Sequence, residues 1–487
     1  MHIKKFFLEN IGQRQTIIKN TFWLGLAEII SGLLRLILLI YVARFLGANK
    51  YGEFMFATAF IMLLGSMGDF GISQITTRQL AQEDKKDYGS IVSLRIFLSL
   101  ATIVVITIGS FFISADYQIR NIIWILGIYI AVSNFCDIFF AFFRAHQKMQ
   151  YEAWSKIIQA LVTTGLGIAL IMLFSNTQSL AYSYVLATII SLIIIAIFFL
   201  KKEGNIPIKI NKTIWKKYLL MAWPLGLMAI CAAVYTYIDS TMMGAMGQVT
   251  QTGWYNAAYK IINIVLIPST LISQSFYPIL SKNFKESKDK LQKTYDKEMG
   301  ITIFLIAPLI VGGIVLAPKI LTFFYNPTFL PAVLAFQILI IMAGVIFINT
   351  VLNQVLIVTH KQKKIFIISL IGAITNVVLN IVLIPRFSLY GAAASTAITY
   401  LILLLLTYLA MSRITDTKPI NIKIFINLLI SIFASFLMFL AIKIPFIYSI
   451  HILLIVLIGA IIYSLAFIIG KTIEKKANHY FKYVRNR

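Results

Sequence analysis

The feature that most constrains this chain is a succession of long apolar runs. A helix needs about 20 apolar residues to cross a hydrocarbon layer of roughly 30 Å. Fourteen runs of about that length follow one another in the 487 residues. They span residues 20–41, 54–75, 91–113, 121–143, 152–174, 179–200, 218–243, 254–277, 300–325, 330–358, 365–384, 390–411, 424–442 and 446–470. Because lipid offers no partner to backbone N–H and C=O groups, each run is predicted to be a membrane-spanning helix.

The composition excludes a soluble protein. Hydrophobic residues make up 59% of the chain and charged residues 13%, about half the charged share of an ordinary soluble domain. A soluble protein of this size has too little interior to hide so much apolar surface. The runs are continuous and lack the weak alternation of a membrane β-barrel. The sequence therefore predicts an all-α integral membrane protein with about 14 transmembrane helices.

The net charge of +25 is unevenly distributed along the chain. If the N-terminus is cytoplasmic, 33 of the 43 Lys and Arg residues fall on the cytoplasmic side and 6 on the outer side. This asymmetry obeys the positive-inside rule and predicts a multi-pass protein of the cytoplasmic membrane with both termini in the cytoplasm. The positive charge also attracts anionic membrane lipid. No nucleic-acid partner is needed to explain it.

A weak internal repeat joins the two halves of the chain. Helix one contains Trp23-Leu24-Gly25 and helix seven contains Trp223-Pro224-Leu225-Gly226, and each is followed by a turn glycine, Gly52 or Gly253. A repeat of six helices gives both halves the same topology, so an axis along the membrane normal relates them. We therefore expect two six-helix lobes related by a pseudo-two-fold axis, then two extra helices with a basic cytoplasmic tail. These parts are residues 1–200, 201–411 and 412–487.

Several motifs resemble those of a known family. They are Ala43-Arg44-Phe45-Leu46-Gly47 with Tyr51-Gly52, Gly68-Asp69-Phe70-Gly71-Ile72 with Arg78, Gly253 to Lys260, Asn376 to Pro385, and Tyr390 to Thr396. Together they resemble the oligosaccharide-flippase branch (O-antigen and related repeat-unit translocases) of the multidrug/oligosaccharidyl-lipid/polysaccharide exporter superfamily. The resemblance covers helices one to twelve. The chain departs from the family at Ser388, where glycine is frequent.

The resemblance implies a transporter and not an enzyme. A flippase of this branch moves a polyprenyl-pyrophosphate-linked oligosaccharide from the cytoplasmic to the outer leaflet by alternating access, in a bacterial or archaeal cytoplasmic membrane. It needs no cofactor beyond a proton or sodium ion that would drive it. The resemblance also leaves open contacts with other membrane proteins of glycan assembly.

Ionisable residues inside the predicted helices are candidates for the transport path, because each costs about 2.5–3.5 kcal/mol at a helix centre. Five lie toward the cytoplasmic side: Glu28, Asp69, Arg95, Asp137 and Lys156. Three lie in the outer half: Arg35, Asp239 and Lys260. Helices nine to fourteen carry none well inside.

Helical spacing places polar residues in stripes. Gly25, Glu28, Ser31, Gly32 and Arg35 recur every three or four residues in helix one, and a second stripe in helix eight includes Asn256, Lys260 and Asn263. Phosphate oxygens accept charge-assisted hydrogen bonds from Arg and Lys. The predicted substrate-binding residues are Arg35, Lys260, Arg95, Lys156, Glu28, Asn256 and Asn263.

Plainer roles compete with these assignments. Arg95 and Lys156 lie near enough to the cytoplasmic boundary to extend their side chains to water instead. Asp69 and Arg78 are expected to pair between a helix end and a loop, and with Asp137 they form a gating or structural set. Asn376 and Asn380, one turn apart, are more readily explained as hydrogen bonds between helices than as sugar contacts.

Asp239 has two readings, a structural ion pair with Lys260 and a proton or sodium coupling site. A structural pair predicts that Asp239→Asn fails while Asp239→Asn with Lys260→Gln recovers much activity. A coupling site predicts that the double variant stays inactive.

Three other functions were weighed. A multidrug extrusion antiporter of the same fold would favour a more apolar pocket with fewer buried cations than Arg35, Arg95, Lys156 and Lys260 provide. A lipid II or teichoic-acid precursor flippase would share the mechanism. A membrane enzyme would need paired acid and base groups at an outer site, and the outer connections hold only Glu53 and Asp116 as carboxylates.

Overall fold

The fold was analysed in a computed structural model, which describes residues 10–82, 87–203, 208–414 and 417–485. The N-terminal Lys4 and Lys5, which entered the charge count, lie outside these residues. In the described part of the chain every regular element is a helix. The elements are α2 (Gln13–Asp69), α3 (Ile72–Ala81), α4 (Tyr88–Ile113), α5 (Tyr117–Ala145), α6 (Met149–Phe174), α7 (Thr177–Glu203), α8 (Lys212–Ala245), α9 (Val249–Val265), α10 (Ile267–Glu286), α11 (Lys288–Phe324), η1 (Pro327–Ala332), α12 (Val333–Val358), α13 (Gln362–Ile414), α14 (Ile422–Lys443), α15 (Pro445–Ser449) and α16 (Ile452–Arg485).

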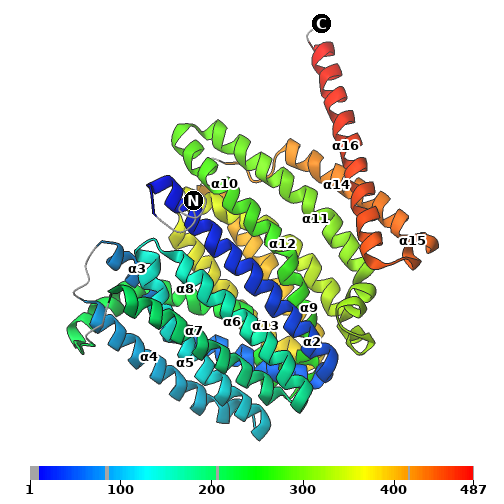
Figure 1. The fold of residues 1–487 in the computed structure, drawn as a ribbon. Coiled ribbons are helices and arrows are strands. Elements are labelled where there is room, and N and C mark those ends of the chain that lie inside the picture. The colour runs from blue at the N-terminus through cyan, green and yellow to red at the C-terminus, as the bar shows by residue number, and fades with distance from the viewer. Residues whose placement is uncertain (1–9, 83–86, 204–207, 415–416, 486–487) are drawn as a thin grey trace. The chain divides into compact units, whose positions relative to one another are not determined.

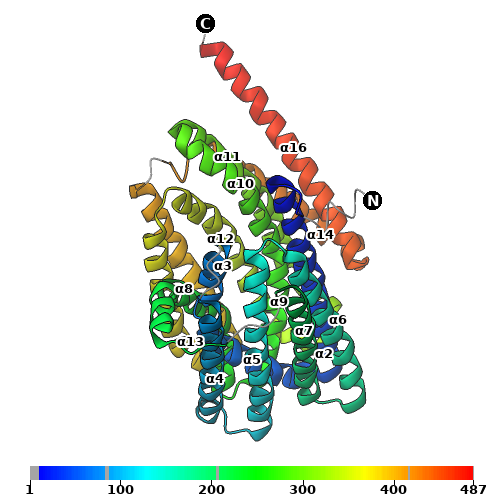
Figure 2. The same cartoon turned by 60° about the vertical axis from the view of Figure 1, so that its left-hand side comes forward.

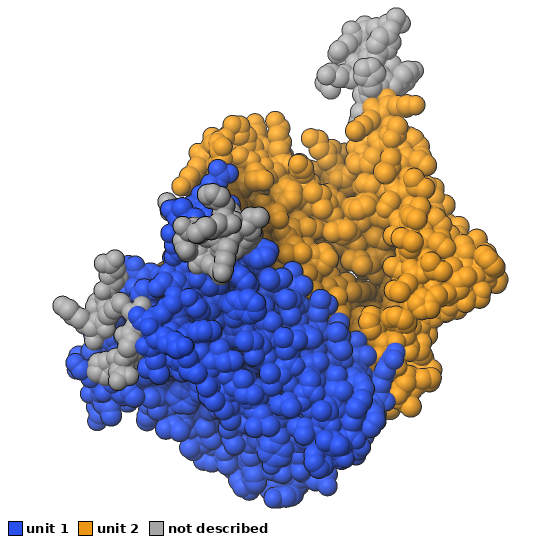
Figure 3. Space-filling model, in the orientation of Figure 1, with its two compact units in different colours: residues 1–253 blue, residues 254–487 orange. Residues whose placement is uncertain are grey.

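The helices group into two compact units, residues 1–253 and 254–487 (Figure 3). In unit 1, α2 packs against α4, α5, α6 and α8, and α7 packs against both α5 and α6 (Figure 1). In unit 2, α12 packs against α11 and α13, and the late helices α14 and α16 pack against each other and against α11. This grouping follows spatial packing. The lobes 1–200 and 201–411 expected from the repeat stay a prediction.

Twelve helical segments of the described residues are long and apolar enough to cross a membrane. Two of them are too long for one crossing: α2 has 57 residues and α13 has 53, and 57 residues of helix measure about 85 Å. Each is interrupted by one non-helical residue, Gly47 (φ 77°, ψ 176°) in α2 and Ser388 (φ 54°, ψ −131°) in α13. Both interruptions fall between two of the apolar runs, and Figure 2 shows α2 changing direction along its length.

Turns at corresponding places of the expected repeat share an uncommon backbone conformation. Positive φ occurs after helices one and seven at Gly47 (77°) and Gly247 (76°). It occurs after helices four and ten at Gln147 (59°) and His360 (61°), and after helices five and eleven at Ser175 (49°) and Ser388 (54°). The turns at Gln147 and His360 also close with the same bond, Lys148 N–H to Phe143 C=O and Lys361 N–H to Leu356 C=O, both 2.8 Å. The sign of φ therefore agrees at these three pairs of turns, although ψ differs at the last pair, 34° at Ser175 and −131° at Ser388.

The two turn glycines of the repeat meet inside unit 1. A Cβ atom on Gly52 would lie 1.9 Å from the carbonyl oxygen of Val249, and one on Gly253 would lie 2.1 Å from that of Ala48. Real Cβ atoms do not approach so closely, so only glycine fits at either position. The start of the second half of α2 and the start of α9 thus touch backbone to backbone, as small residues allow between membrane helices.

Ser388 is held in a conformation that suits glycine, because φ 54° with ψ −131° crowds any Cβ atom. We expect Ser388→Gly to stabilise the protein by about 1 kcal/mol, the relieved strain less the added entropy of the unfolded chain. The same change at Ser369, in a regular stretch of α13, should instead destabilise by roughly 0.5–1 kcal/mol. Thermal unfolding of both variants in detergent checks this. A lower melting temperature for Ser388→Gly than for the parent would contradict the strain.

Candidate functional site

Unit 1 contains a cavity of about 200 Å³ among α2, α5, α6 and α7. Its lining is mostly polar. The residues are Glu28, Ser31, Arg35, Tyr129, Ser133, Asp137, Phe140, Lys156, Gln159, Ala160, Thr163, Thr164 and Tyr184. Four residues predicted for the site from the sequence, Glu28, Arg35, Asp137 and Lys156, thus lie around one cavity.

Helix α2 turns one face to the cavity and packs with another. Ala27 and Ser31 are buried, and the Ser31 hydroxyl is 3.4 Å from the carbonyl oxygen of Lys156 on α6. Glu28 and Arg35 are exposed on the open face. Gly25 and Gly32 lie on the same face, and a Cβ atom added at either position would have no other atom within 4 Å. The stripe read from the sequence therefore borders open space instead of a packed helix.

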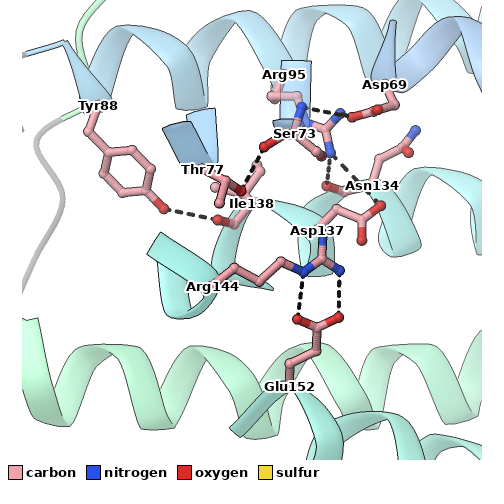
Figure 4. A network of polar contacts seen from close by, with 10 residues as sticks. All are labelled: Asp69, Ser73, Thr77, Tyr88, Arg95, Asn134, Asp137, Ile138, Arg144 and Glu152. Atoms are coloured by element: carbon pink, nitrogen blue, oxygen red, sulfur yellow. Dashed lines mark hydrogen bonds and ion pairs between the residues drawn. The ribbon is translucent and has the colours of Figure 1, made fainter. Parts of the chain in front are cut away.

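A first cluster of charges lies beside the cavity. The Arg95 guanidinium on α4 forms an ion pair with Asp69, approaches Asp137 to 3.9 Å and donates to the Asn134 carbonyl oxygen at 3.3 Å (Figure 4). The Asp69 carboxylate also accepts from the Ser73 backbone N–H at 3.1 Å, which caps the start of α3. Arg95 is only 2% exposed. It is an interior residue, and the alternative that it reaches to water is wrong.

The expected pairing of Asp69 with Arg78 is also wrong. Arg78 is exposed near the end of α3, and Asp69 pairs with Arg95 instead. Phe70 and Gly71 both have positive φ, so the chain turns sharply between Asp69 and α3. A prediction from distance along the sequence cannot include such a turn.

A second cluster is centred on Glu152, which the sequence analysis did not single out. Its carboxylate accepts from Arg144 Nε at 2.7 Å and Nη2 at 2.5 Å (Figure 4). It also pairs with Lys156 Nζ at 2.8 Å. The Glu152 side chain is 1% exposed, while its two partners are about one third exposed. Its position at the start of an apolar run hid its role. The i,i+4 spacing to Lys156 was the signal available.

These two clusters leave two charges uncompensated at the cavity. Among the described residues, Arg95, Arg144 and Lys156 each pair with a carboxylate. Neither Arg35 nor Glu28 has an ion-pair partner in that same part of the chain. The cavity therefore offers one cation and one carboxylate that are free to meet a ligand.

The remaining predicted residues do not border this cavity. Asn256, Lys260 and Asn263 belong to α9 in unit 2, where Asn256 is buried, Lys260 half-buried and Asn263 exposed. Asp239 on α8 is buried in unit 1. Their roles in substrate binding and ion coupling stay predictions.

One buried carboxylate lies just before the ninth predicted run and was not among the residues predicted from the sequence. Glu298 on α11 is 0% exposed. Neither of its carboxylate oxygens has a hydrogen-bond partner among the described residues. The sequence analysis missed it because the ninth apolar run begins two residues later, whereas α11 starts already at Lys288.

Comparisons with known proteins agree with one another. A family model described as polysaccharide biosynthesis protein matches residues 17–284, and the MatE model matches residues 224–382. The probable low-salt glycan biosynthesis flippase Agl15 of Haloferax volcanii is 19% identical over 78% of this chain and 80% of its own. The capsular polysaccharide biosynthesis protein CapF of Staphylococcus aureus is 24% identical over 82% of this chain and its entire length. The fold matches that of the lipid II flippase MurJ in its inward closed conformation, with a TM-score of 0.77 at 16% identity over 93% of this chain and 98% of that one.

The Glu152 cluster can be tested by removing its central charge. Glu152→Gln leaves Arg144 and Lys156 without a carboxylate, so we expect a loss of about 1–3 kcal/mol in stability. Asp87→Asn is the control, because Asp87 pairs at 3.4 Å with Lys217, which is 54% exposed, and such pairs contribute at most about 1 kcal/mol. Melting temperatures in detergent give the comparison. Equal temperatures for the two variants would show that the cluster does not stabilise unit 1.

Proposed function

Because the chain belongs to the polysaccharide biosynthesis protein family, we propose that it carries a polyprenyl-pyrophosphate-linked oligosaccharide from the cytoplasmic to the outer leaflet by alternating access. The chain is a multi-pass membrane transporter of the lipid-linked glycan flippase type, not an enzyme. The names of the relatives, which refer to glycan and capsular polysaccharide biosynthesis, support a sugar-bearing lipid as the cargo.

The observation that carries the proposal is Arg35. It borders the cavity and has no ion-pair partner among the described residues. A guanidinium placed at hydrocarbon depth without a carboxylate is costly, and a pyrophosphate supplies the missing charge through paired hydrogen bonds. Lys156 also borders the cavity and was predicted to bind substrate, but it is paired with Glu152 at 2.8 Å, so Arg35 is the main cation for the anion. Arg95 acts through Asp137 rather than by touching the cargo.

Further contacts with the cargo are proposed from the sequence alone. Lys260, Asn256 and Asn263 would contact the cargo from α9, and Asp239 would bind the coupling proton or sodium ion.

A multidrug antiporter is the competing function, since the MatE model matches residues 224–382. Arg35 opposes it, because a guanidinium at the cavity with no ion-pair partner among the described residues calls for an anionic group on the cargo. A lipid II or teichoic-acid precursor remains within the proposed class, since each is a lipid pyrophosphate or phosphate that bears sugar.

Replacing Arg35 tests the proposal. We expect Arg35→Ala to lower export at least tenfold, since a charge-assisted hydrogen bond contributes about 1.5–3 kcal/mol. Arg35→Lys should recover part of it, because ammonium keeps the charge but loses the planar fork. Mass spectrometry of lipid-linked sugars that accumulate in a deletion strain complemented with each variant gives the measurement.

Arg120→Ala is the matched control. Arg120 lies on α5 with its guanidinium 5.2 Å from the Phe111 ring centre and does not border the cavity, so export should stay near the parent level. Parental export by Arg35→Ala at a normal protein level would remove Arg35 from the proposal.

The proposed topology is fourteen crossings with both termini in the cytoplasm. Splitting α2 at Gly47 and α13 at Ser388 turns the twelve candidate spans into fourteen. Cysteines introduced near Lys212 and Lys288 should then resist a membrane-impermeant thiol reagent in intact cells and react in inverted vesicles. The native Cys136 and Cys231 are buried, so background labelling should be low. Strong labelling in intact cells would reverse the orientation.

A further inference from the structure

Glu28 is the carboxylate that the proposed function does not use. It borders the cavity from α2 and is exposed on the open face. No ion pair of Glu28 occurs among the described residues. Gly25 and Gly32 flank it by about one turn on either side, and neither would bring a Cβ atom near another residue. The Glu28 carboxylate therefore lies on an open part of the α2 surface, with glycines about one turn before and after it on this face.

The charges around Glu28 balance without it. The two clusters contain three carboxylates and three cations, namely Asp69, Asp137, Glu152, Arg95, Arg144 and Lys156. Lys156, the cation of this group that borders the cavity, is already engaged by Glu152 at 2.8 Å. The cytoplasmic end of the cavity consequently carries one net negative charge, located on Glu28.

The cavity is therefore polarised along α2. Glu28 and Arg35 are seven residues apart on one face, about 10 Å along the helix axis. Arg35 supplies donors at one end. At the other end, Glu28 supplies a carboxylate, and an ionised carboxylate can only accept hydrogen bonds.

We propose that Glu28 makes this end of the cavity a subsite for a sugar that donates hydrogen bonds and bears no acid group. The proposal rests on the proposed function and narrows its cargo. A neutral N-acetylated sugar offers hydroxyl and amide N–H donors, and an amino sugar adds an ammonium group. A uronic acid would place a second carboxylate beside Glu28, and the two like charges would repel each other. Selectivity arises from that repulsion as much as from the attractive contacts.

The test uses synthetic farnesyl pyrophosphate and three of its glycosides, which carry glucosamine, N-acetylglucosamine or glucuronic acid. Binding of each probe to the purified full chain in detergent is measured by native mass spectrometry. For the parent we expect the glucuronic acid probe to bind about tenfold more weakly than the other two, as one uncompensated like-charge contact would cause. In Glu28→Gln that difference should disappear, mainly because the glucuronic acid probe gains affinity.

Matched variants make the result specific. Glu53→Gln removes another carboxylate of α2 that hydrogen-bonds to Thr177 at 3.2 Å and does not border the cavity, so it should keep the parental difference. Glu28→Asp keeps the charge one methylene shorter and should retain most of it. If Glu28→Gln fails to fold, Glu28→Ser and the Glu28→Asp variant still separate charge from structure.

The two proposals fail in different ways. Equal binding of the three glycosides by the parent, or an unchanged difference in Glu28→Gln, overturns the subsite while leaving the flippase intact. Equal weakening of all four probes by Arg35→Ala supports the pyrophosphate contact independently of the sugar. If the parent binds none of the four, both the subsite and the proposed function fall.

Discussion

The cost of holding a charge among apolar helices governs the construction of unit 1. An isolated charge at hydrocarbon depth is expensive, and removal of one member of a buried pair exposes that cost. The cost of the Arg95 charge is offset by ion pairs with Asp69 and Asp137. The cost of the Glu152 charge is offset by ion pairs with Arg144 and Lys156. The helices α4, α5 and α6 and the end of α2 are thereby tied together near one end of the bundle. The cavity walls are held by the same contacts.

Because the other charges around the cavity are paired, the two charges left unpaired among the described residues, Arg35 and Glu28, point to a binding site. If unpaired charges were scattered through the unit, the lack of ion pairs at Arg35 and Glu28 would not indicate a binding site. They instead stand on one face of one helix, both at the cavity, while their neighbours are paired. The same face carries two glycines with open space before them. The protein thus has open space and unpaired charged side chains at the same place, and both are needed to bind a polar headgroup within an apolar layer.

The sequence sufficed for what depends on periodicity and failed where the chain turns. Run length predicted the apolar helices, and the three- and four-residue spacing predicted the open face of Glu28 and Arg35. The partner of Asp69 was missed because positive φ at Phe70 and Gly71 redirects the chain away from Arg78. Glu152 and Glu298 were missed because hydropathy marks a helix by its apolar part and overlooks charged residues that enter at its ends.

The turns at Gln147 and His360, at corresponding places of the expected repeat, bear on how such a repeat can be recognised. At corresponding positions glutamine stands against histidine, at Gln147 and His360, yet both have φ near 60°. Each turn depends on a left-handed residue to close its hydrogen bonds, and several polar side chains tolerate that conformation. The residue type at such a turn can therefore change while φ stays positive. For the expected repeat, φ at Gln147 and His360 agrees where the residue types do not, so comparing backbone angles at turns complements the alignment of side chains when two halves of a membrane protein are matched.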